Sequence, residues 1–135
     1  MPRPFASPEV AAAFDGFAPS PRAGLLALRR MILEEAAALS QIGPVEECLR
    51  WGQPAYLTPR TKAATTLRLG TARTGEFALF VHCRTRLIPD FTAQFPGRDR
   101  VEGTRAVIFD HASQIDSLRH GWLIRRALTY HLAAP

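Results

Sequence analysis

The segment Glu46–Tyr56 constrains the fold of this chain more than any other stretch. It contains a glycine, Gly52, and a proline, Pro54, and neither residue suits the interior of a helix. Trp51 and Tyr56 flank this pair. We therefore expect a short helical turn over residues 46–49, a change of backbone direction at Gly52 and Pro54, and the first strand of a sheet directly afterwards.

Two helices are predicted before this segment. Ser7-Pro8-Glu9 combines a hydroxyl cap, a proline at the first helical position and an acid favoured by the helix dipole, and predicts a helix to about Asp15. Ser20-Pro21 repeats the start signal for a second helix, which runs to about residue 41 and stops before Gly43-Pro44. Apolar residues recur along it at intervals of three and four and define its buried stripe: Leu25, Leu28, Ile32, Ala36 and Leu39.

Strands are predicted after the segment. Residues 65–70 alternate apolar and polar side chains, whereas 77–83 are apolar on both faces, which is typical of a central strand. A short helix is expected over residues 84–95, a further strand over 104–109, and a last helix over 115–132. The residues expected to be buried on this last helix are Ile115, Leu118, Trp122, Ala127, Leu128 and Leu132.

The order of these elements indicates an α+β fold. We expect an antiparallel sheet of about four to five strands with helices packed on one face, in a single domain over residues 1–135. Residues 1–20 form its N-terminal helix and connection. The chain has no apolar run long enough to cross a membrane and no leader pattern at its start, so we expect a cytoplasmic protein. Cys48 and Cys83 are expected to be reduced thiols.

Several short motifs resemble the YdhG-like family of bacterial domains of unknown function. They are Glu47, Leu49, Trp51-Gly52, Pro54-Ala55-Tyr56, then residues 80–83, 103–109 and 127–131, so the similarity covers nearly the whole chain from the second helix on. The resemblance implies a frataxin-like sandwich and no established enzyme activity. One member of the family has a frataxin-type role in iron delivery. This sequence departs from the commoner pattern at Gln53, where methionine is usual, and at residues 59–62.

The charge of the chain is concentrated in its middle. The net charge is +5, from 17 basic and 12 acidic residues, and residues 60–105 hold nine of the basic and four of the acidic groups, which accounts for the whole excess. Such a field attracts phosphate, carboxylate or nucleic acid. A solvated arginine-rich surface is the alternative. The aromatic residues are not interleaved with the arginines along one strand, which speaks against a nucleic-acid surface.

Metal binding finds little support in the sequence. The acidic doublets Glu34-Glu35 and Glu46-Glu47 lie beside arginines, which favours ion pairing over an iron site. His82 and Cys83 are neighbours on a strand and so face opposite sides of the sheet. A site built from Cys48, His82 or His111 on separate elements is left open. We expect no cofactor.

Catalysis is also weakly indicated. A thiolate becomes a good nucleophile when a base lowers its pKa, but only Cys48 with a distant histidine offers such a pair. The chain lacks the glycine-rich, Walker, nucleophile-elbow and zinc-protease motifs. The sequence therefore leans away from an enzyme without deciding the question.

A binding module is the function that the sequence favours. Trp51 and Tyr56 are predicted to present two amphipathic rings at one end of the sheet, with Lys62, Arg84 and Arg86 supplying charge beside them. These five residues would capture a small anionic or planar ligand or a protein partner. A homodimer is left open, and a membrane partner is not expected. The alternatives are that both rings are simply core, and that the protein is a frataxin-type iron chaperone.

Overall fold

The first helix begins where the Ser7-Pro8 pattern predicts it. In the computed structural model, which describes residues 3–132, α1 spans Pro8–Asp15 and the Ser7 hydroxyl accepts a hydrogen bond from the Val10 N–H. Helix α2 spans Pro19–Ala37 and therefore starts one residue before Ser20 and ends earlier than predicted. A 3-10 turn, η1 (Ser40–Ile42), follows and ends at Gly43.

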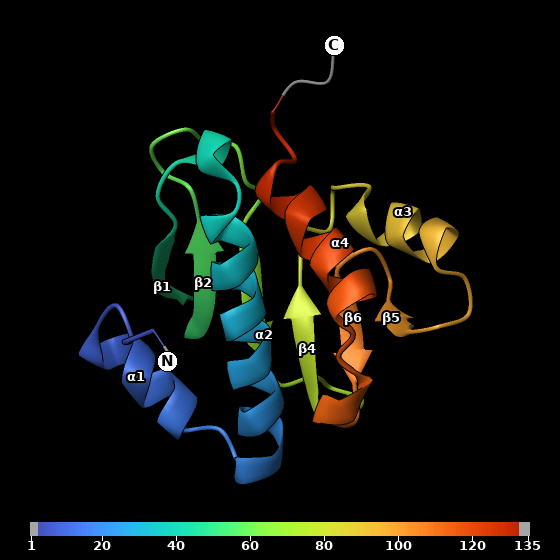
Figure 1. Cartoon of the computed structure of the whole chain (residues 1–135). Helices are drawn as coiled ribbons and strands as arrows, with labels where there is room; N and C mark the ends of the chain where they lie inside the picture. The colour runs from blue at the N-terminus through green and yellow to red at the C-terminus, as the bar shows by residue number, and fades with distance from the viewer. Residues whose placement is uncertain (1–2, 133–135) are drawn as a thin grey trace.

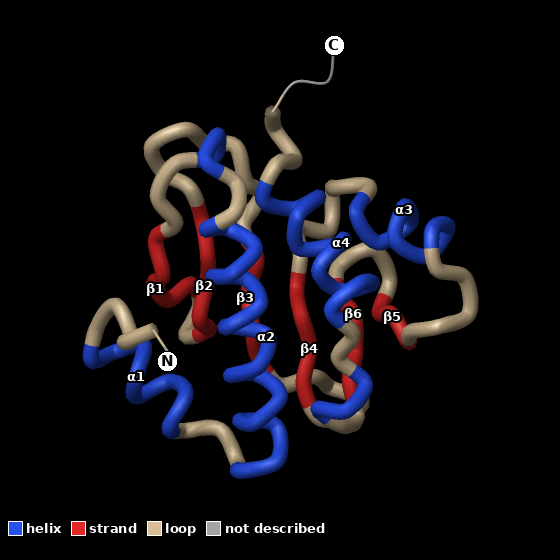
Figure 2. Tube along the Cα trace, viewed as in Figure 1, coloured by secondary structure: helices blue, strands red, loops and turns tan. Residues whose placement is uncertain are grey.

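In the described part of the chain, residues 3–132, six strands form one antiparallel sheet, rather than the four to five expected (Figures 1 and 2). They run in the order β1-β2-β3-β4-β6-β5, so the first four strands pair in sequence order and β4 and β3 are central. The strands are β1 (Glu46–Arg50), β2 (Gln53–Leu57), β3 (Leu67–Gly70), β4 (Phe77–Phe80), β5 (Arg100–Glu102) and β6 (Ala106–Phe109). The prediction of an α+β fold with a central strand at Phe77 is confirmed.

The helical turn predicted over residues 46–49 is wrong, because these residues form strand β1. They pair with β2 through a tight hairpin in which Arg50 lies opposite Gln53 and Glu46 lies opposite Leu57. The local preference of glutamate for helices is overridden by this pairing. Gly52 accordingly occupies the hairpin turn, and Pro54 lies within β2, opposite Leu49.

The helices cover one face of the sheet, and the main core lies between the two layers (Figure 1). Helix α2 packs closely on the sheet at Gly24, where an added Cβ would lie 2.1 Å from the Phe77 ring. The Phe77 ring in turn stacks on that of Phe109, with centroids 5.0 Å apart. Within residues 3–132, the other side of the sheet carries no helix, and we call it the open face.

The last two helices correct part of the predicted burial. Helix α3 (Leu87–Gln94) buries Leu87, Ile88 and Phe91 as expected. Helix α4 spans Ser117–Leu128, after a second 3-10 turn, η2 (Ala112–Gln114). Leu118 and Leu132 were expected to be buried, but they are 69% and 38% exposed. The stripe that α4 buries consists of His120, Gly121, Leu123, Ile124, Ala127 and Leu128.

Among residues 3–132, no helix combines the length and apolar character needed to cross a membrane.

Strand β5 was not predicted, because its sequence Arg100-Val101-Glu102 places a single apolar residue between two charges.

Candidate functional site

A two-residue turn joins β1 to β2 and carries a highly exposed tryptophan. Trp51 and Gly52 both have positive φ angles, 51° and 75°, as a type I′ hairpin turn requires. Glycine adopts this conformation freely, whereas a residue with a Cβ is strained in it. The Trp51 side chain is nonetheless 88% exposed. An aromatic residue that is both strained and exposed contributes little to stability, so its position points to a contact outside the chain.

Arg68, on β3, lies beside the Trp51 indole on the open face. Its guanidinium carbon is 5.2 Å from the centroid of the Trp51 ring and 5.3 Å from that of Phe80. It also donates a hydrogen bond to the Gln53 side-chain oxygen. These four residues, Trp51, Gln53, Arg68 and Phe80, form what we call the Trp51 patch.

Arg68 lacks an acidic partner within residues 3–132, where every ion pair is made by other residues. Burial and the nearby charge of Arg105 lower the pKa of Arg68. The patch therefore holds a partly buried cation that an external anion would stabilise.

The sheet beneath the patch supports this arrangement. Ala78, Phe80, Ala106 and Ile108 form a small apolar cluster on the open face, separate from the main core. Gly70 makes room for the Gln53 side chain, since an added Cβ would lie 2.4 Å from its nitrogen. Gln53 is thus held across β3, in position to accept from Arg68.

Tyr56 is not part of the patch. It is fully buried on the helix side of the sheet, and its hydroxyl donates a hydrogen bond of 2.7 Å to Glu47. The prediction that Trp51 and Tyr56 present paired rings is wrong, because Trp51 projects from the turn while Tyr56 faces the core.

Lys62, Arg84 and Arg86 lie at the other end of the sheet. Lys62 is in the β2–β3 connection and the two arginines are in the β4–α3 connection, whereas Trp51 is in the β1–β2 turn. Antiparallel pairing places these connections at opposite strand ends. All three side chains are exposed. The structure does not bring them to Trp51, and their role in binding stays a prediction.

A buried polar network ties the N-terminal segment to the sheet. Arg29, on α2, donates to Glu47 from Nε at 2.6 Å, and to the Arg3 and Pro4 carbonyl oxygens at 2.8 and 3.0 Å. Burial opposes ionisation of Glu47, but hydrogen bonds from Arg29, Tyr56 and the Ala6 N–H outweigh it and lower its pKa. Burial, followed by the bond to Glu47, raises the pKa of Tyr56.

One glutamate of each acidic doublet is used for ion pairing, as predicted for the doublets, although through a different arginine. Glu47 pairs with Arg29 rather than with the adjacent Arg50, and Glu35 accepts from Arg125 on α4 at 3.0 Å. These pairs join the helices to each other and to β1. No group of three or more His, Cys, Asp or Glu side chains within residues 3–132 is arranged to hold a metal ion.

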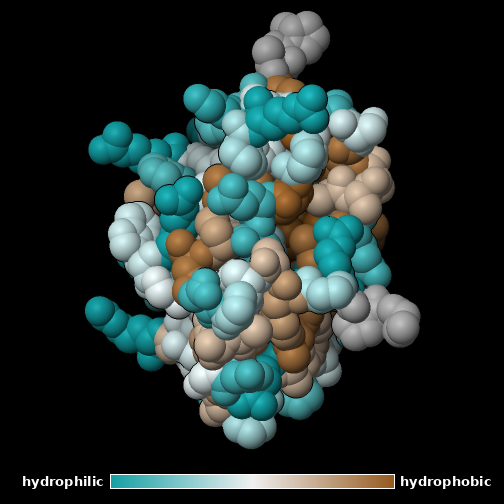
Figure 3. Space-filling model, turned by 90° about the vertical axis from the view of Figure 1, so that its left-hand side faces the viewer, coloured by the Kyte–Doolittle hydropathy of each residue, from teal (hydrophilic) through white to brown (hydrophobic). Residues whose placement is uncertain are grey.

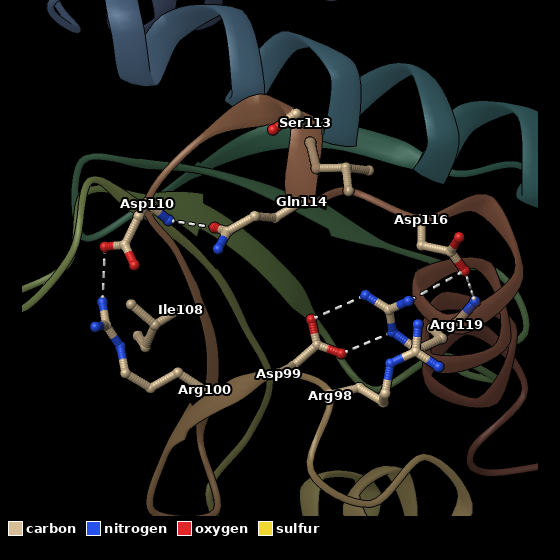
Figure 4. A pocket seen from close by; sticks show the side chains of 10 residues that line it. Arg98, Asp99, Arg100, Ile108, Asp110, Ser113, Gln114, Asp116 and Arg119 are labelled. Carbon is tan, nitrogen blue, oxygen red and sulfur yellow. Dashed lines mark hydrogen bonds and ion pairs between the residues drawn. The ribbon is translucent and has the colours of Figure 1, made fainter.

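A polar cleft of about 260 Å³ lies between the β5–β6 hairpin and the start of α4 (Figure 4). Asp99 accepts hydrogen bonds of 2.9 Å from Arg119 Nε and from His120 Nε2. His120 Nδ1 accepts the Asp116 N–H at 2.8 Å, so the proton is on Nε2. Burial raises the pKa of Asp99, but the bonds from His120 and Arg119 outweigh it and lower the value.

The carboxylates that line this cleft are engaged by arginines, Asp110 by Arg100 and both Asp99 and Asp116 by Arg119. Both nitrogens of the fully buried His120 ring are occupied, and Asp99 is held by two donors. Arg100 at the rim pairs with Asp110 at 2.9 Å. The arrangement therefore serves as a structural ion-pair network that joins α4 to the sheet.

An apolar groove of about 630 Å³ lies between the N-terminal segment and the outer side of α2. Figure 3 looks onto the side of the molecule that carries α1 and β1, and hydrophobic residues gather on its right-hand, helical half. The groove is lined by Arg3, Pro4, Phe5, Leu26, Arg29, Arg30, Leu33, Glu34 and Ala37. Of its charged side chains, Arg29 is already paired with Glu47.

The cysteines form no recognisable nucleophile–base pair. Both thiols are free, and Cys83 is exposed. Burial and a hydrogen bond to Glu46 raise the pKa of Cys48, which disfavours the thiolate. His82 Nδ1 accepts the Arg84 N–H at 3.1 Å and so is engaged with its own loop.

Comparison of the chain with protein-family models, with curated proteins and with solved structures gave no match. The resemblance to the YdhG-like family therefore stays a prediction.

The sequence identified Trp51 but missed the residues that surround it. Arg68 and Phe80 lie directly opposite each other on β3 and β4. Strand alternation alone places both on the face turned away from the core. Their position beside Trp51 depends on the pairing register of three strands, and no local sequence pattern reveals that register.

Proposed function

We propose that this chain is a non-catalytic protein-binding module that uses the Trp51 patch as its contact surface. The observation that carries the proposal is the Trp51 side chain, exposed in a strained turn and placed beside Arg68, a cation that has no counter-ion among residues 3–132. The partner would offer an apolar pocket for the indole and a carboxylate for Arg68.

The shape of the patch favours a protein partner over a small ligand. Small-molecule sites are concave, whereas Trp51 projects from a hairpin turn, and the cleft and groove described above lie elsewhere. Tryptophan and arginine are also the residues most enriched at the energetic centres of protein interfaces. A carboxylate that pairs with Arg68 would in addition form a charge-assisted hydrogen bond.

The proposal also includes a cellular compartment and a fold family. We infer a cytoplasmic module, and the two free thiols support a reducing compartment. Helices layered on one face of an antiparallel sheet are compatible with a YdhG-like, frataxin-like fold. The iron-chaperone alternative is not favoured by any side-chain cluster within residues 3–132.

Selection from a random peptide library tests the proposal. The wild-type chain is used as bait without counter-selection, and the enriched peptides are synthesised and measured by fluorescence anisotropy against the wild type and each variant. We expect acidic peptides with an apolar anchor. Their affinity should fall about 30-fold with Trp51→Ala, as at a hot spot of about 2 kcal/mol, and about tenfold with Arg68→Gln.

Leu118→Ala provides the matched control, because Leu118 is another exposed large hydrophobic residue, on α4 and outside the patch. It should bind the same peptides as the wild type does. Circular dichroism establishes that each variant is folded. Peptides that bind Trp51→Ala unchanged would contradict the assignment of the patch, and stoichiometric binding of ferrous iron in an anaerobic titration would favour the chaperone instead.

A further inference from the structure

Strand β1 is an edge strand, and within residues 3–132 no strand pairs with its outer side. Helix α1 packs on the helix side of this hairpin and contacts both β1 and β2. The side of the molecule that carries β1 faces the viewer in Figure 3. An open edge of this kind is a template for pairing with another strand.

The hairpin determines which backbone groups of β1 point outward. Residues that flank a two-residue turn form a hydrogen-bonded pair, so Arg50, Cys48 and Glu46 bond to β2. Pro54 agrees with this alternation of bonded and non-bonded pairs. It has no N–H to donate, and it lies opposite Leu49, where the alternation requires no backbone bond between β1 and β2. The N–H and C=O groups of Glu47 and Leu49 therefore point to the free edge.

The free edge of β1 is complementary to the same edge of a second copy of the chain. Glu46, Cys48 and Arg50 alternate onto the open face, with opposite charges at the two ends and the thiol midway. If a second β1 is laid alongside in the antiparallel direction and centred on Cys48, each Glu46 lies opposite the other copy's Arg50. The same register places Glu47 opposite Leu49, so the outward backbone groups of both copies meet and bond.

We propose that two copies of this chain associate through β1, antiparallel and about a twofold axis at Cys48. Two backbone-bonded pairs and two cross-strand charge pairs hold the copies together. The two six-stranded sheets then become one continuous sheet, with both Trp51 patches on its open face. This association does not depend on what the Trp51 patch binds.

The geometry at the axis makes a sharp test available. The two Cys48 residues form a pair without backbone bonds between them, for which the Cα atoms are about 4.5 Å apart. That separation is within the range of a disulfide. In a Cys83→Ser background, copper–phenanthroline passes two electrons from the two thiols to dioxygen and releases two protons. We expect a covalent dimer through Cys48 that is absent from Cys48→Ser.

The charge pairs are tested by sedimentation over a range of protein concentrations. Arg50→Glu turns both pairs into like-charge pairs and should weaken the dimer about tenfold. The double variant Glu46→Arg with Arg50→Glu restores opposite charges and should restore the dimer. Glu9→Arg, an exposed change on α1, is the control and should have no effect. Circular dichroism establishes that all variants are folded.

Four results would contradict the proposed dimer through β1. A wild-type chain that stays monomeric at every concentration would overturn it. So would a dimer that Arg50→Glu leaves unchanged, or one that the double variant fails to restore. A dimer that resists Cys48 cross-linking would refute the register.

Discussion

Replacing Glu47 by glutamine should severely destabilise the fold. Glu47 and Arg29 are buried, with side chains 6% and 5% exposed, and Arg29 also holds the Arg3 and Pro4 carbonyl oxygens. The substitution keeps the shape of the side chain but removes the only charge that offsets the buried guanidinium within residues 3–132. It also leaves the Tyr56 hydroxyl and the Arg29 nitrogens facing an amide that must donate as well as accept.

The expected magnitude follows from this burial. Removing one partner of a buried ion pair costs about 3–5 kcal/mol, because the remaining charge is left without compensation. Since a domain of this size is typically stable by about 5–15 kcal/mol, Glu47→Gln should lose a large part of the free energy of unfolding. Urea unfolding followed by circular dichroism measures the difference. Glu76→Gln, an exposed carboxylate in the β3–β4 connection, should change the value by less than about 0.5 kcal/mol.

The pH dependence gives a second measurement. The pKa of Glu47 is lowered in the folded state, so its contribution is complete above the ordinary glutamate pKa of about 4.3 and is lost as pH falls through the lower folded value. The difference between wild type and Glu47→Gln should therefore be constant near neutral pH and shrink in acid. A difference below about 1 kcal/mol at pH 7, or one that grows as pH falls, would refute this reasoning.

Three further outcomes are expected, all measured by urea unfolding. Gly24→Ala should cost at least about 1–3 kcal/mol, because the new Cβ would overlap the Phe77 ring, and a neutral result would mean that α2 shifts freely on the sheet. Asp99→Asn should cost about 3 kcal/mol at pH 7 by leaving Arg119 without its main partner, and the loss should fade in acid, because the pKa of Asp99 is lowered in the folded state. Trp51→Asn should leave the fold as stable or more so, because asparagine tolerates positive φ; marked destabilisation would show that the indole is structural.

Much of the fold could be predicted from local signals. Ser7-Pro8 places the start of α1, and the apolar residues on both faces of Phe77–Phe80 identify the central strand. These succeed because capping geometry and burial on both faces each leave a distinct local pattern. Strand β1 leaves no such local pattern, because its core-facing side includes the charged residue Glu47. The partner of Glu47, Arg29, is brought to it only by the tertiary fold.

The buried face of α4 could not be predicted fully from hydropathy, for a different reason. Residues 120, 123, 124, 127 and 128 follow the helical period, but the first of them is histidine, which counts as polar in a hydropathy pattern. Its burial depends on Asp99 and on the Asp116 N–H, neither of which is visible as a partner in the sequence. The predicted stripe was therefore shifted toward Leu118, which faces solvent.

The Trp51 patch was only partly predictable for a related reason. An aromatic residue before glycine marks a turn, but its exposure depends on how the hairpin projects from the sheet. The neighbouring Arg68 comes from another hairpin, and the pairing of Arg68 with Phe80 requires the β3–β4 register. Local patterns identified the turn and its tryptophan, whereas the cation beside it follows from strand order.

The strand order also has a kinetic consequence. Strands β1 to β4 can assemble as successive hairpins with short connections, but β4 pairs next with β6, and residues 81–105, including α3, must be spanned before that pairing forms. Closing this longer connection between β4 and β6 costs more conformational entropy than closing any of the hairpin connections. The rate of refolding should consequently be governed by the docking of the β5–β6 hairpin, with the first four strands already assembled.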